Sequence, residues 1–359
     1  MEMTDKGDPG VLKRSTRLMT RWDMSRLIAV LTQKYIVYGP VTKDGSTSFR
    51  EISQYQDIDF NYKTTILSPR KYLHKPFETL FSFSEGGKTV LDGIPGHDRK
   101  MQILFGLHPC DVKAIQLLDR VFTGKYEDPY YIAHRKNTLI FALSCNQAEE
   151  TCFCSSFGAG PGLENGADVV ITQIGEKFLV EPVSRDGEDL LKQLRIGRTM
   201  NDDTLTRYAQ KKAEKLQHVL DGIKKHLDTT DLSELLESNT NHPVWAKIKE
   251  DCLACGACTI SCPTCYCFNI TDHLDLTLQS GERRRVWDSC MLLEFAEVAL
   301  GANFRNDLAA RTKQRIYHKL YSYHFQHDDW GCVGCGRCIK FCLKRIDPRD
   351  IIEELRGEH

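Results

Sequence analysis

The sequence of 359 residues lacks the features that mark several common protein classes. It has no apolar run of about 18 residues, so we expect no membrane-spanning helix. Lys and Arg (48 residues) nearly balance Asp and Glu (49 residues), so no net charge attracts the chain to nucleic acid or to a membrane surface. The opening stretch, MEMTDKGDPGVLKRSTR, lacks the apolar core of a secretory signal, which favours a cytoplasmic location.

Nucleotide-binding motifs are also missing from the sequence. It contains neither the G-x-G-x-x-G turn of dinucleotide-binding folds nor the Walker phosphate loop, and it shows no nucleophile–base constellation. We therefore expect that the chain binds neither a flavin nor a nicotinamide, and that it is not catalytic alone.

Cysteine is absent before Cys110 and abundant after it. The sequence holds 15 cysteines, an odd number that cannot all form disulfides, and eleven of them lie between Cys252 and Cys342. In a reducing compartment, clustered thiols indicate metal ligands or redox groups more often than disulfide bridges. The sequence therefore concentrates metal chemistry in its last third.

Two stretches of the sequence form an internal repeat, CLACGACTISC at 252–262 and CVGCGRCIKFC at 332–342. Both have the spacing C-x2-C-x2-C-x3-C of two-cluster ferredoxins, in which three thiolates hold one [4Fe–4S] cluster and the fourth holds the other. Gly256 and Gly336 occupy matching positions in the two runs, and Pro263 follows the first run, whereas Leu343 follows the second. We assign Cys252, Cys255, Cys258 and Cys342 to cluster A, and Cys332, Cys335, Cys338 and Cys262 to cluster B.

Two other metal sites use similar cysteine patterns. Structural zinc is bound by two C-x2-C pairs separated by a spacer, whereas each run here packs four thiols into eleven residues. Cys258, Cys262 and Cys265 also match the C-x3-C-x2-C pattern of radical S-adenosylmethionine enzymes. Only 94 residues follow Cys265, too few for the barrel that those enzymes build downstream.

Residues 1–240 predict a mixed α/β domain. MQILFGL (101–107) is a short apolar strand, Asp111 stands where a helix cap belongs before an amphipathic helix over 112–122, and NTLIFALSC (137–145) is a second apolar strand. A strand, a helix and a strand in this order indicate a right-handed βαβ crossover with parallel strands.

Further segments complete the predicted outline of the two domains. We expect a helix over 22–34, a hairpin over 168–182 and two amphipathic helices over 204–226 and 230–238. Residues 241–359 then form a mostly α-helical, dicluster ferredoxin-like domain. Its two cysteine runs are separated by predicted helices over 283–301 and 308–325.

Four cysteines of the first domain predict a third metal site. Cys110 follows the first strand of the βαβ unit, Cys145 ends the second, and Cys152 and Cys154 lie on the loop that leaves Cys145. The carboxyl ends of adjacent parallel strands lie side by side, so these thiols can converge on a third [4Fe–4S] cluster. The alternatives are thiols buried as small apolar groups, or a zinc site.

The remaining candidate residues carry weaker signals. His108 can be a ligand or a packed histidine, and Cys265, Cys267 and Cys290 can ligate iron or pack beside the clusters. A further set of cations can form a solvated helix face, offset the negative charge of a cluster, or dock a partner. This set comprises Arg283, Arg284, Arg285, Lys313, Arg315 and Lys319.

Several motifs outside the cysteine runs resemble one protein family. They are PCDVKAIQLLD (109–119), DPYYIAHR (128–135), Cys145 followed by CFCSSFG (152–158), CPTCYCF (262–268), RRRVWDSCM (283–291) and GCVGCGRC (331–338). The sequence resembles the beta subunits of cytoplasmic sulfhydrogenases, which are NiFe hydrogenases, and the A subunit of anaerobic sulfite reductase.

This resemblance implies a relay role. The family's iron–sulfur subunit passes electrons between a subunit that binds flavin and NAD(P)H and a catalytic subunit, which carries a NiFe site in the sulfhydrogenases and siroheme in the sulfite reductase. The alternative is an autonomous oxidoreductase with its active site at an open N-terminal cluster, although four thiols at that site favour the relay. A scaffold built around zinc fits the spacing poorly.

Overall fold

The computed structural model describes residues 15–84, 88–90 and 100–357. The start of the chain, which we interpreted as lacking a signal core, lies outside the described residues up to residue 14. No helix in the described part of the chain is long and apolar enough to cross a membrane.

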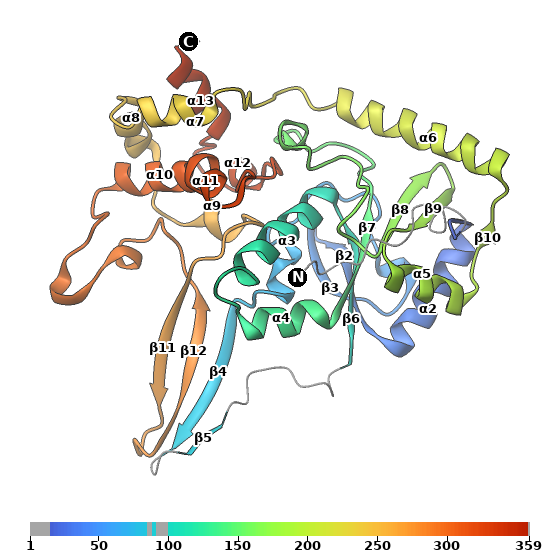
Figure 1. Cartoon of the computed structure of the whole chain (residues 1–359), viewed down its shortest axis with the longest axis horizontal. Helices are drawn as coiled ribbons and strands as arrows, with labels where there is room; N and C mark the ends of the chain where they lie inside the picture. Colours follow the sequence, from blue (N-terminus) through green and yellow to red (C-terminus); the bar gives the residue numbers. More distant parts are fainter. Residues whose placement is uncertain (1–14, 85–87, 91–99, 358–359) are drawn as a thin grey trace.

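An eight-stranded sheet forms the centre of the larger part of the fold (Figure 1). Its inner strands β2, β6, β7 and β8 run parallel, and the strands at both margins are antiparallel. In spatial order the strands are β10 (Arg198–Thr199), β1 (Arg17–Met19), β9 (Lys177–Pro182), β8 (Val169–Ile174), β7 (Thr138–Leu143), β6 (Gln102–Leu107), β2 (Ile36–Lys43) and β3 (Ser46–Glu51).

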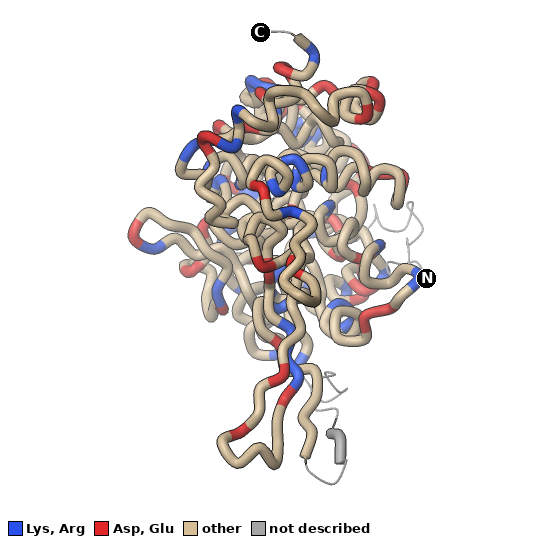
Figure 2. Tube along the Cα trace, turned by 90° about the vertical axis from the view of Figure 1, so that its left-hand side faces the viewer, with Lys and Arg blue, Asp and Glu red and all other residues tan. Residues whose placement is uncertain are grey.

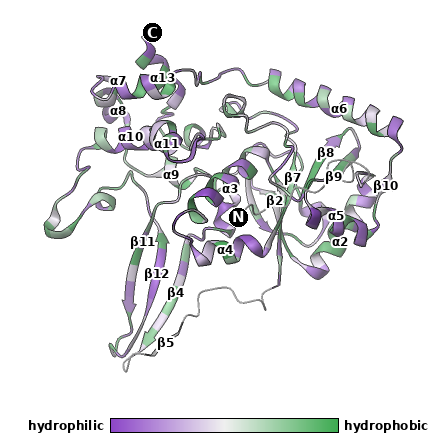
Figure 3. Cartoon of the chain, in the orientation of Figure 1, coloured by the Kyte–Doolittle hydropathy of each residue, from purple (hydrophilic) through white to green (hydrophobic). Residues whose placement is uncertain are grey.

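The inner strands are apolar, and helices and loops bury them. Every residue of β7 (TLIFAL) is buried, and the hydropathy colours of Figure 3 mark β7 and β8 as hydrophobic. Near-continuous apolar runs of this kind are typical of parallel strands covered on both faces. The helices beside the sheet are α2 (Arg21–Lys34), α3 (Pro109–Phe122), α4 (Pro129–Lys136) and α5 (Arg185–Leu194).

The structure confirms the predicted βαβ unit and hairpin. β6 and β7 pair in parallel, with α3 and α4 between them in the sequence. β8 and β9 pair antiparallel around Gly175 and Glu176, and the predicted helix over 22–34 is α2. The prediction of Asp111 as the helix cap is wrong. The helix begins at Pro109 after His108, because proline suits the first helical position, and Asp111 lies inside the first turn.

A second, four-stranded sheet extends from the fold as an arm. Its order is β11 (Phe268–Leu274), β12 (Ser280–Trp287), β4 (Phe77–Ser84) and β5 (Lys88–Val90). Figure 2 shows acidic and basic residues lying side by side along this arm. One of these pairs is Arg283 with Asp272, whose side chains meet at 2.7 Å.

The predicted helix over 283–301 is wrong. Its first residues belong to β12, which pairs with β11 on one side and with the distant strand β4 on the other. The rest forms the short turns Glu294–Ala296 and Ala299–Gly301, and positive φ angles at Leu300 (66°) and Gly301 (73°) interrupt any helix there.

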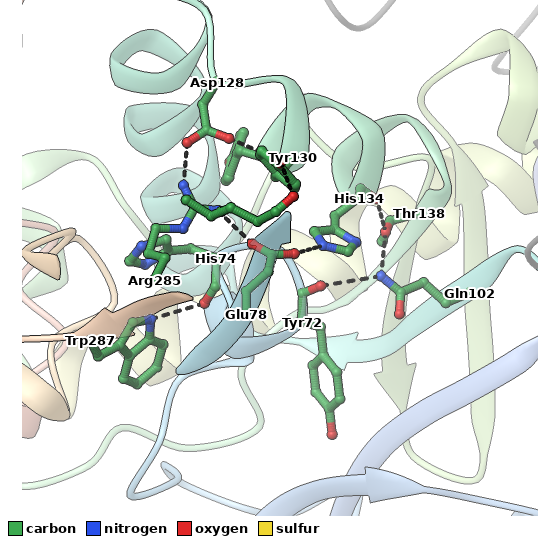
Figure 4. A network of polar contacts seen from close by, with 12 residues as sticks. Tyr72, His74, Glu78, Gln102, Asp128, Tyr130, His134, Thr138, Arg285 and Trp287 are labelled. Atoms are coloured by element: carbon green, nitrogen blue, oxygen red, sulfur yellow. Dashed lines mark hydrogen bonds and ion pairs between the residues drawn. The ribbon is translucent and has the colours of Figure 1, made fainter. Parts of the chain in front are cut away.

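Buried polar contacts anchor the base of the arm (Figure 4). Glu78 of β4 contacts His134 of α4 at 2.6 Å and Arg285 of β12 at 2.6 Å. Arg285 also donates to Asp128, and the indole of Trp287 donates to the carbonyl oxygen of His74. The arm is therefore fixed to the α/β part by charged side chains from both halves of the chain.

Helices α6 to α13 make up most of the remaining chain. The predicted helices over 204–226 and 230–238 correspond to α6 (Asp202–Asp221), which ends earlier than expected, and to α7 (Leu232–Ser238). The predicted helix over 308–325 is α10 (Leu308–Tyr317), which continues through the π-helical turn η6 (His318–Ser322) into α11 (Tyr323–His327). The others are α8 (Val244–Asp251), α9 (Ala257–Ile260), α12 (Arg337–Lys340) and α13 (Pro348–Arg356).

The C-terminal part contains strands as well as helices, so its expected mostly helical character is found only in part. Its hairpin of β11 and β12 lies in one sheet with β4 and β5. Since β4 pairs with β12, one sheet spans the expected division between residues 1–240 and 241–359, and that division stays a prediction.

Candidate metal centres

Three cavities in the structure are lined by cysteine side chains. Cavity A contains four cysteines of the predicted set for cluster A, and cavity B contains the four of the predicted set for cluster B. Cavity A is lined by Cys252, Cys255, Cys258 and Cys342 together with Cys338, and cavity B by Cys262, Cys332, Cys335 and Cys338. The last cysteine of each run therefore lies with the first three of the other run.

The local fold explains this exchange. In each run a glycine with a positive φ angle, Gly256 (71°) or Gly336 (70°), precedes a one-turn helix. The helices α9 and α12 lie in contact, and Cys262 and Cys342 follow them. Because each run turns into a helix before its last thiol, that thiol leaves the first cavity and reaches the second.

Cavity C lies at the carboxyl ends of β6 and β7. It is lined by all four cysteines of the predicted third set, Cys110, Cys145, Cys152 and Cys154, and also by Cys335 of the second run. The structure thus brings together every thiol that the sequence placed at this edge. Their role as iron ligands remains a prediction.

Two glycines of the second cysteine run allow the loop that lines cavity C to pack closely against that run. A Cβ atom on Gly334 would clash with the carbonyl oxygen of Phe153, and one on Gly336 would clash with the carbonyl oxygen of Thr151. The backbone N–H of Phe153 donates to the carbonyl oxygen of Gly334 at 2.8 Å. The loop that carries Cys152 and Cys154 therefore lies directly on the second cysteine run.

Burial makes several thiols of these cavities weak acids. It raises the pKa of Cys154 and of Cys332 to about 12, and that of Cys258 to about 11. Burial likewise raises the pKa values of Cys110 and Cys145 well above the usual range. Thiolates at these positions need a nearby positive charge, which iron ions supply when a cluster is bound.

The residues of cavity C fit a bound group. His108 is 4% exposed, lines the cavity and stacks on Tyr62 with ring centroids 3.9 Å apart. Its Nε2 atom has no hydrogen-bond partner among the residues that the structure describes, and burial lowers its pKa to about 4. The imidazole is therefore a neutral polar group at the edge of the cavity, and a bound group there would give this nitrogen a partner.

The side chains do not gather tightly enough for a single ion. Among the described residues, no group of three His, Cys, Asp or Glu side chains is arranged to hold one metal ion.

A buried ion pair lies at cavity C, which is lined by Arg337. The guanidinium of Arg337 donates to both carboxylate oxygens of Asp111, at 2.8 and 2.7 Å, and both residues are 1% exposed. Arg337 also donates to the carbonyl oxygen of Thr65. Our sequence interpretation missed this pair. The only available signal was an arginine inside the cysteine run, because its partner lies more than 200 positions away.

The remaining cysteines line none of the three cavities. The thiol of Cys265 hydrogen bonds to Cys262, which holds the pKa of Cys262 well below its usual value. The thiol of Cys290 hydrogen bonds to Cys267 and lowers the pKa of Cys267 to about 7. These three residues therefore form a second layer of thiols beside the predicted ligands.

The predicted cationic set does not form one surface. Arg283, Arg284 and Arg285 pair with carboxylates of the arm and its base, and Lys313 donates to the carbonyl oxygen of Thr240. Arg315 and Lys319 instead line the cysteine cavities. Of the roles left open for this set, the geometry favours charge compensation for these two residues.

Comparison with known proteins agrees with this arrangement. Residues 251–346 match the family model described as a 4Fe-4S dicluster domain. The chain is 33% identical over 320 residues to the sulfhydrogenase 2 subunit beta of Pyrococcus furiosus, across 89% of this chain and 92% of that protein. The chain belongs to the family of sulfhydrogenase beta subunits. It is an iron–sulfur electron-transfer subunit with [4Fe–4S] clusters, related to hydrogenase oxidoreductases.

A weaker relative also carries iron–sulfur chemistry in its name. An uncharacterized iron-sulfur protein of Methanococcus maripaludis is 26% identical over 190 residues, which cover 52% of this chain and 30% of that protein. No solved structure matches the chain.

Proposed function

We propose that the chain holds three [4Fe–4S] clusters in a row and relays electrons between two partner subunits of a cytoplasmic oxidoreductase. One partner binds flavin and NAD(P)H, and the other is catalytic, of the hydrogenase or sulfite reductase type. The observation that carries this proposal is the continuity of the three cysteine cavities.

Each neighbouring pair of cavities shares a cysteine. Cys338 lines both cavity A and cavity B, and Cys335 lines both cavity B and cavity C. A [4Fe–4S] cluster accepts and releases one electron at a time, and its ligands are the shortest covalent route away from it. Centres that are separated by a single side chain favour a relay in the order A, B, C.

The cysteines at the two ends of this row differ in exposure to solvent, since no cysteine of the third set at cavity C is fully exposed. At cavity A, Cys255 is exposed, and the neighbouring side chains of Leu253 and Leu343 are 55% and 78% exposed. Apolar side chains in contact with solvent around a ligand suit a surface that a partner subunit covers. We therefore place one partner at cavity A, and the other near cavity C beside the glycine-rich loop 155–168.

The four thiols of cavity C support the relay over an autonomous enzyme. A catalytic cluster needs an open position, whereas Cys110, Cys145, Cys152 and Cys154 supply one thiolate for each iron. A chain with 15 cysteines that are proposed as cluster ligands and their neighbours suits a reducing compartment such as the cytoplasm.

The iron content of the anaerobically purified full chain tests this proposal. With one cubane for every four thiolates, we expect about twelve irons and about twelve acid-labile sulfides per chain. About eight irons would remove cavity C from the relay, and zinc in place of iron would refute the proposal entirely.

A second test concerns turnover. Dithionite should reduce the clusters of the isolated chain, whereas NAD(P)H, H2 and sulfite should give no steady turnover without partner subunits. Sustained NADPH oxidation by the chain alone would contradict the relay and favour the autonomous enzyme.

A further inference from the structure

Three cations surround the thiols of cavity B without a carboxylate partner among the described residues. Lys319, on the π-helical turn η6, is 8% exposed and lines the cavity. It donates to the carbonyl oxygen of Thr264 at 2.8 Å and to its hydroxyl at 2.9 Å. Because these acceptors are neutral, Lys319 retains its full charge beside Cys262.

Arg315 and Arg70 extend this cationic surround. Arg315 of α10 lines both cavity A and cavity B, and its guanidinium hydrogen bonds to the thiol of Cys338. Arg70 is 2% exposed, stacks on Trp287 with its guanidinium 3.7 Å from the ring centroid, and donates to the carbonyl oxygens of Ile260 and Cys265. The carbonyl acceptors of Arg70 carry no net charge, and the acceptor of Arg315 is a cysteine sulfur of the cavity itself. No carboxylate therefore neutralises either cation among the described residues.

Cavity C has a different charge environment. Its neighbouring cation Arg337 is neutralised by the bidentate contact with Asp111. Lys63 also lines the cavity, but its side chain is exposed to solvent. Lys215 lies near Cys145, but it is only partly buried and does not line the cavity. The buried cations without a carboxylate partner are therefore concentrated at cavity B.

A buried cation without a counter-ion is costly unless an anion lies nearby. A cubane ligated by four thiolates is an anion, and it becomes more negative when it gains an electron. Cations at its edge stabilise the reduced state more than the oxidised state, and they raise the reduction potential.

We propose that Lys319 and Arg315 tune cluster B to a higher reduction potential than cluster C, so that an electron on cluster C passes to cluster B. The step is balanced within the chain, because cluster C loses the one electron that cluster B gains. This inference rests on the proposed relay and adds a direction to it.

The test is an EPR-monitored redox titration of the anaerobically prepared full chain. Cluster B is identified as the signal that disappears in Cys332→Ser. In Lys319→Met we expect about a tenfold loss in the equilibrium constant for reducing cluster B, equal to a downward shift of about 59 mV for a one-electron couple. Lys319→Gln keeps a donor for Thr264 but loses the charge, so it should show the same shift, and Lys319→Arg should restore the original potential.

Lys313→Met is the matched control. It removes the same charge from the same helical segment, but its side chain reaches the carbonyl oxygen of Thr240 and lines no cysteine cavity. Its titration should equal that of the unaltered chain. If Lys319→Met fails to load iron, the reduction potential of cluster B in Lys319→Gln tests the role of the charge.

Two outcomes separate this inference from the relay itself. An unchanged potential of cluster B in an iron-replete Lys319→Gln chain, or a cluster B potential below that of cluster C, would overturn the tuning and leave the relay intact. An unaltered chain without iron would instead refute the relay.

Discussion

The exchange of the last cysteine between the two runs gives the sharpest prediction. Cys262 belongs to the first run in sequence, but it lines cavity B with Cys332, Cys335 and Cys338. Replacing Cys262 by Ala should therefore damage cluster B and leave cluster A, which is nearer in sequence, unchanged. A ligand set confined to one run would give the opposite result.

The neighbouring thiol of Cys265 complicates the single substitution. It lies within hydrogen-bond distance of Cys262, so it can take over as the fourth ligand. The decisive variant is therefore Cys262→Ala combined with Cys265→Ala. We expect it to lose about four of about twelve irons, since one cubane is held by four thiolates. Cys265→Ala alone is the matched control and should retain all of its iron.

The assay combines iron and sulfide analysis with EPR spectra of the dithionite-reduced chain. The signal lost in the double variant should be the one lost in Cys332→Ser. If the lost signal is instead the one removed by Cys252→Ser, the assignment of Cys262 to cluster B is wrong.

Three further predictions follow from the same geometry. Replacing all four cysteines of the third set by Ala should remove about four irons and leave the C-terminal signals unchanged, and unchanged iron content in a folded chain would show that these thiols are structural. Gly336→Ala should weaken the coupling between clusters B and C or prevent loading of cluster C, because its Cβ would clash with the backbone of Thr151. In the matched Gly256→Ala the new Cβ meets only side-chain atoms, of which Ser289 Oγ is the nearest at 3.3 Å, so equal spectra for the two variants would contradict this. For Glu78, burial raises the pKa, but the hydrogen bonds and charges of His134 and Arg285 outweigh it, so that the pKa lies below the ordinary 4.5. The stabilisation from Glu78 is present above pH 4.5 and is lost as the pH falls through the lowered pKa, so the Tm of Glu78→Gln should depend less on pH in this acid range than that of the unaltered chain.

Local patterns in the sequence predicted much of the candidate site. The βαβ unit was predicted because two apolar strands flank one amphipathic helix, and the positions of Cys110 and Cys145 follow from that unit. The cysteine spacing predicted the exchange of Cys262 and Cys342, since a thiol placed after a helical turn points away from the preceding three. Such inferences place the thiols where a local motif or a single βαβ unit determines the direction in which each thiol points.

Contacts between distant segments were not predictable in this way. The stretch RRRVWDSCM has helix-compatible composition, but β4 supplies a pairing edge about 200 residues earlier, and the tertiary pairing overrides local propensity. The same limit applies to Arg337, whose partner Asp111 was interpreted as a helix cap. In both cases the partner, a strand edge or a carboxylate, lies in the other half of the chain.

These long-range contacts explain why cavity C adjoins cavity B, with which it shares Cys335. Gly334 and Gly336 allow the second cysteine run to lie against the loop of Cys152 and Cys154, and any side chain at either position would separate the two. Arg337, from the same run, reaches across to Asp111 at the start of α3, directly after Cys110. The second run therefore contributes to all three cavities, through Cys342 to A, Cys338 to B and Cys335 to C. A two-cluster ferredoxin module requires only the first two of these contacts, and the third joins the module to the edge of the parallel sheet.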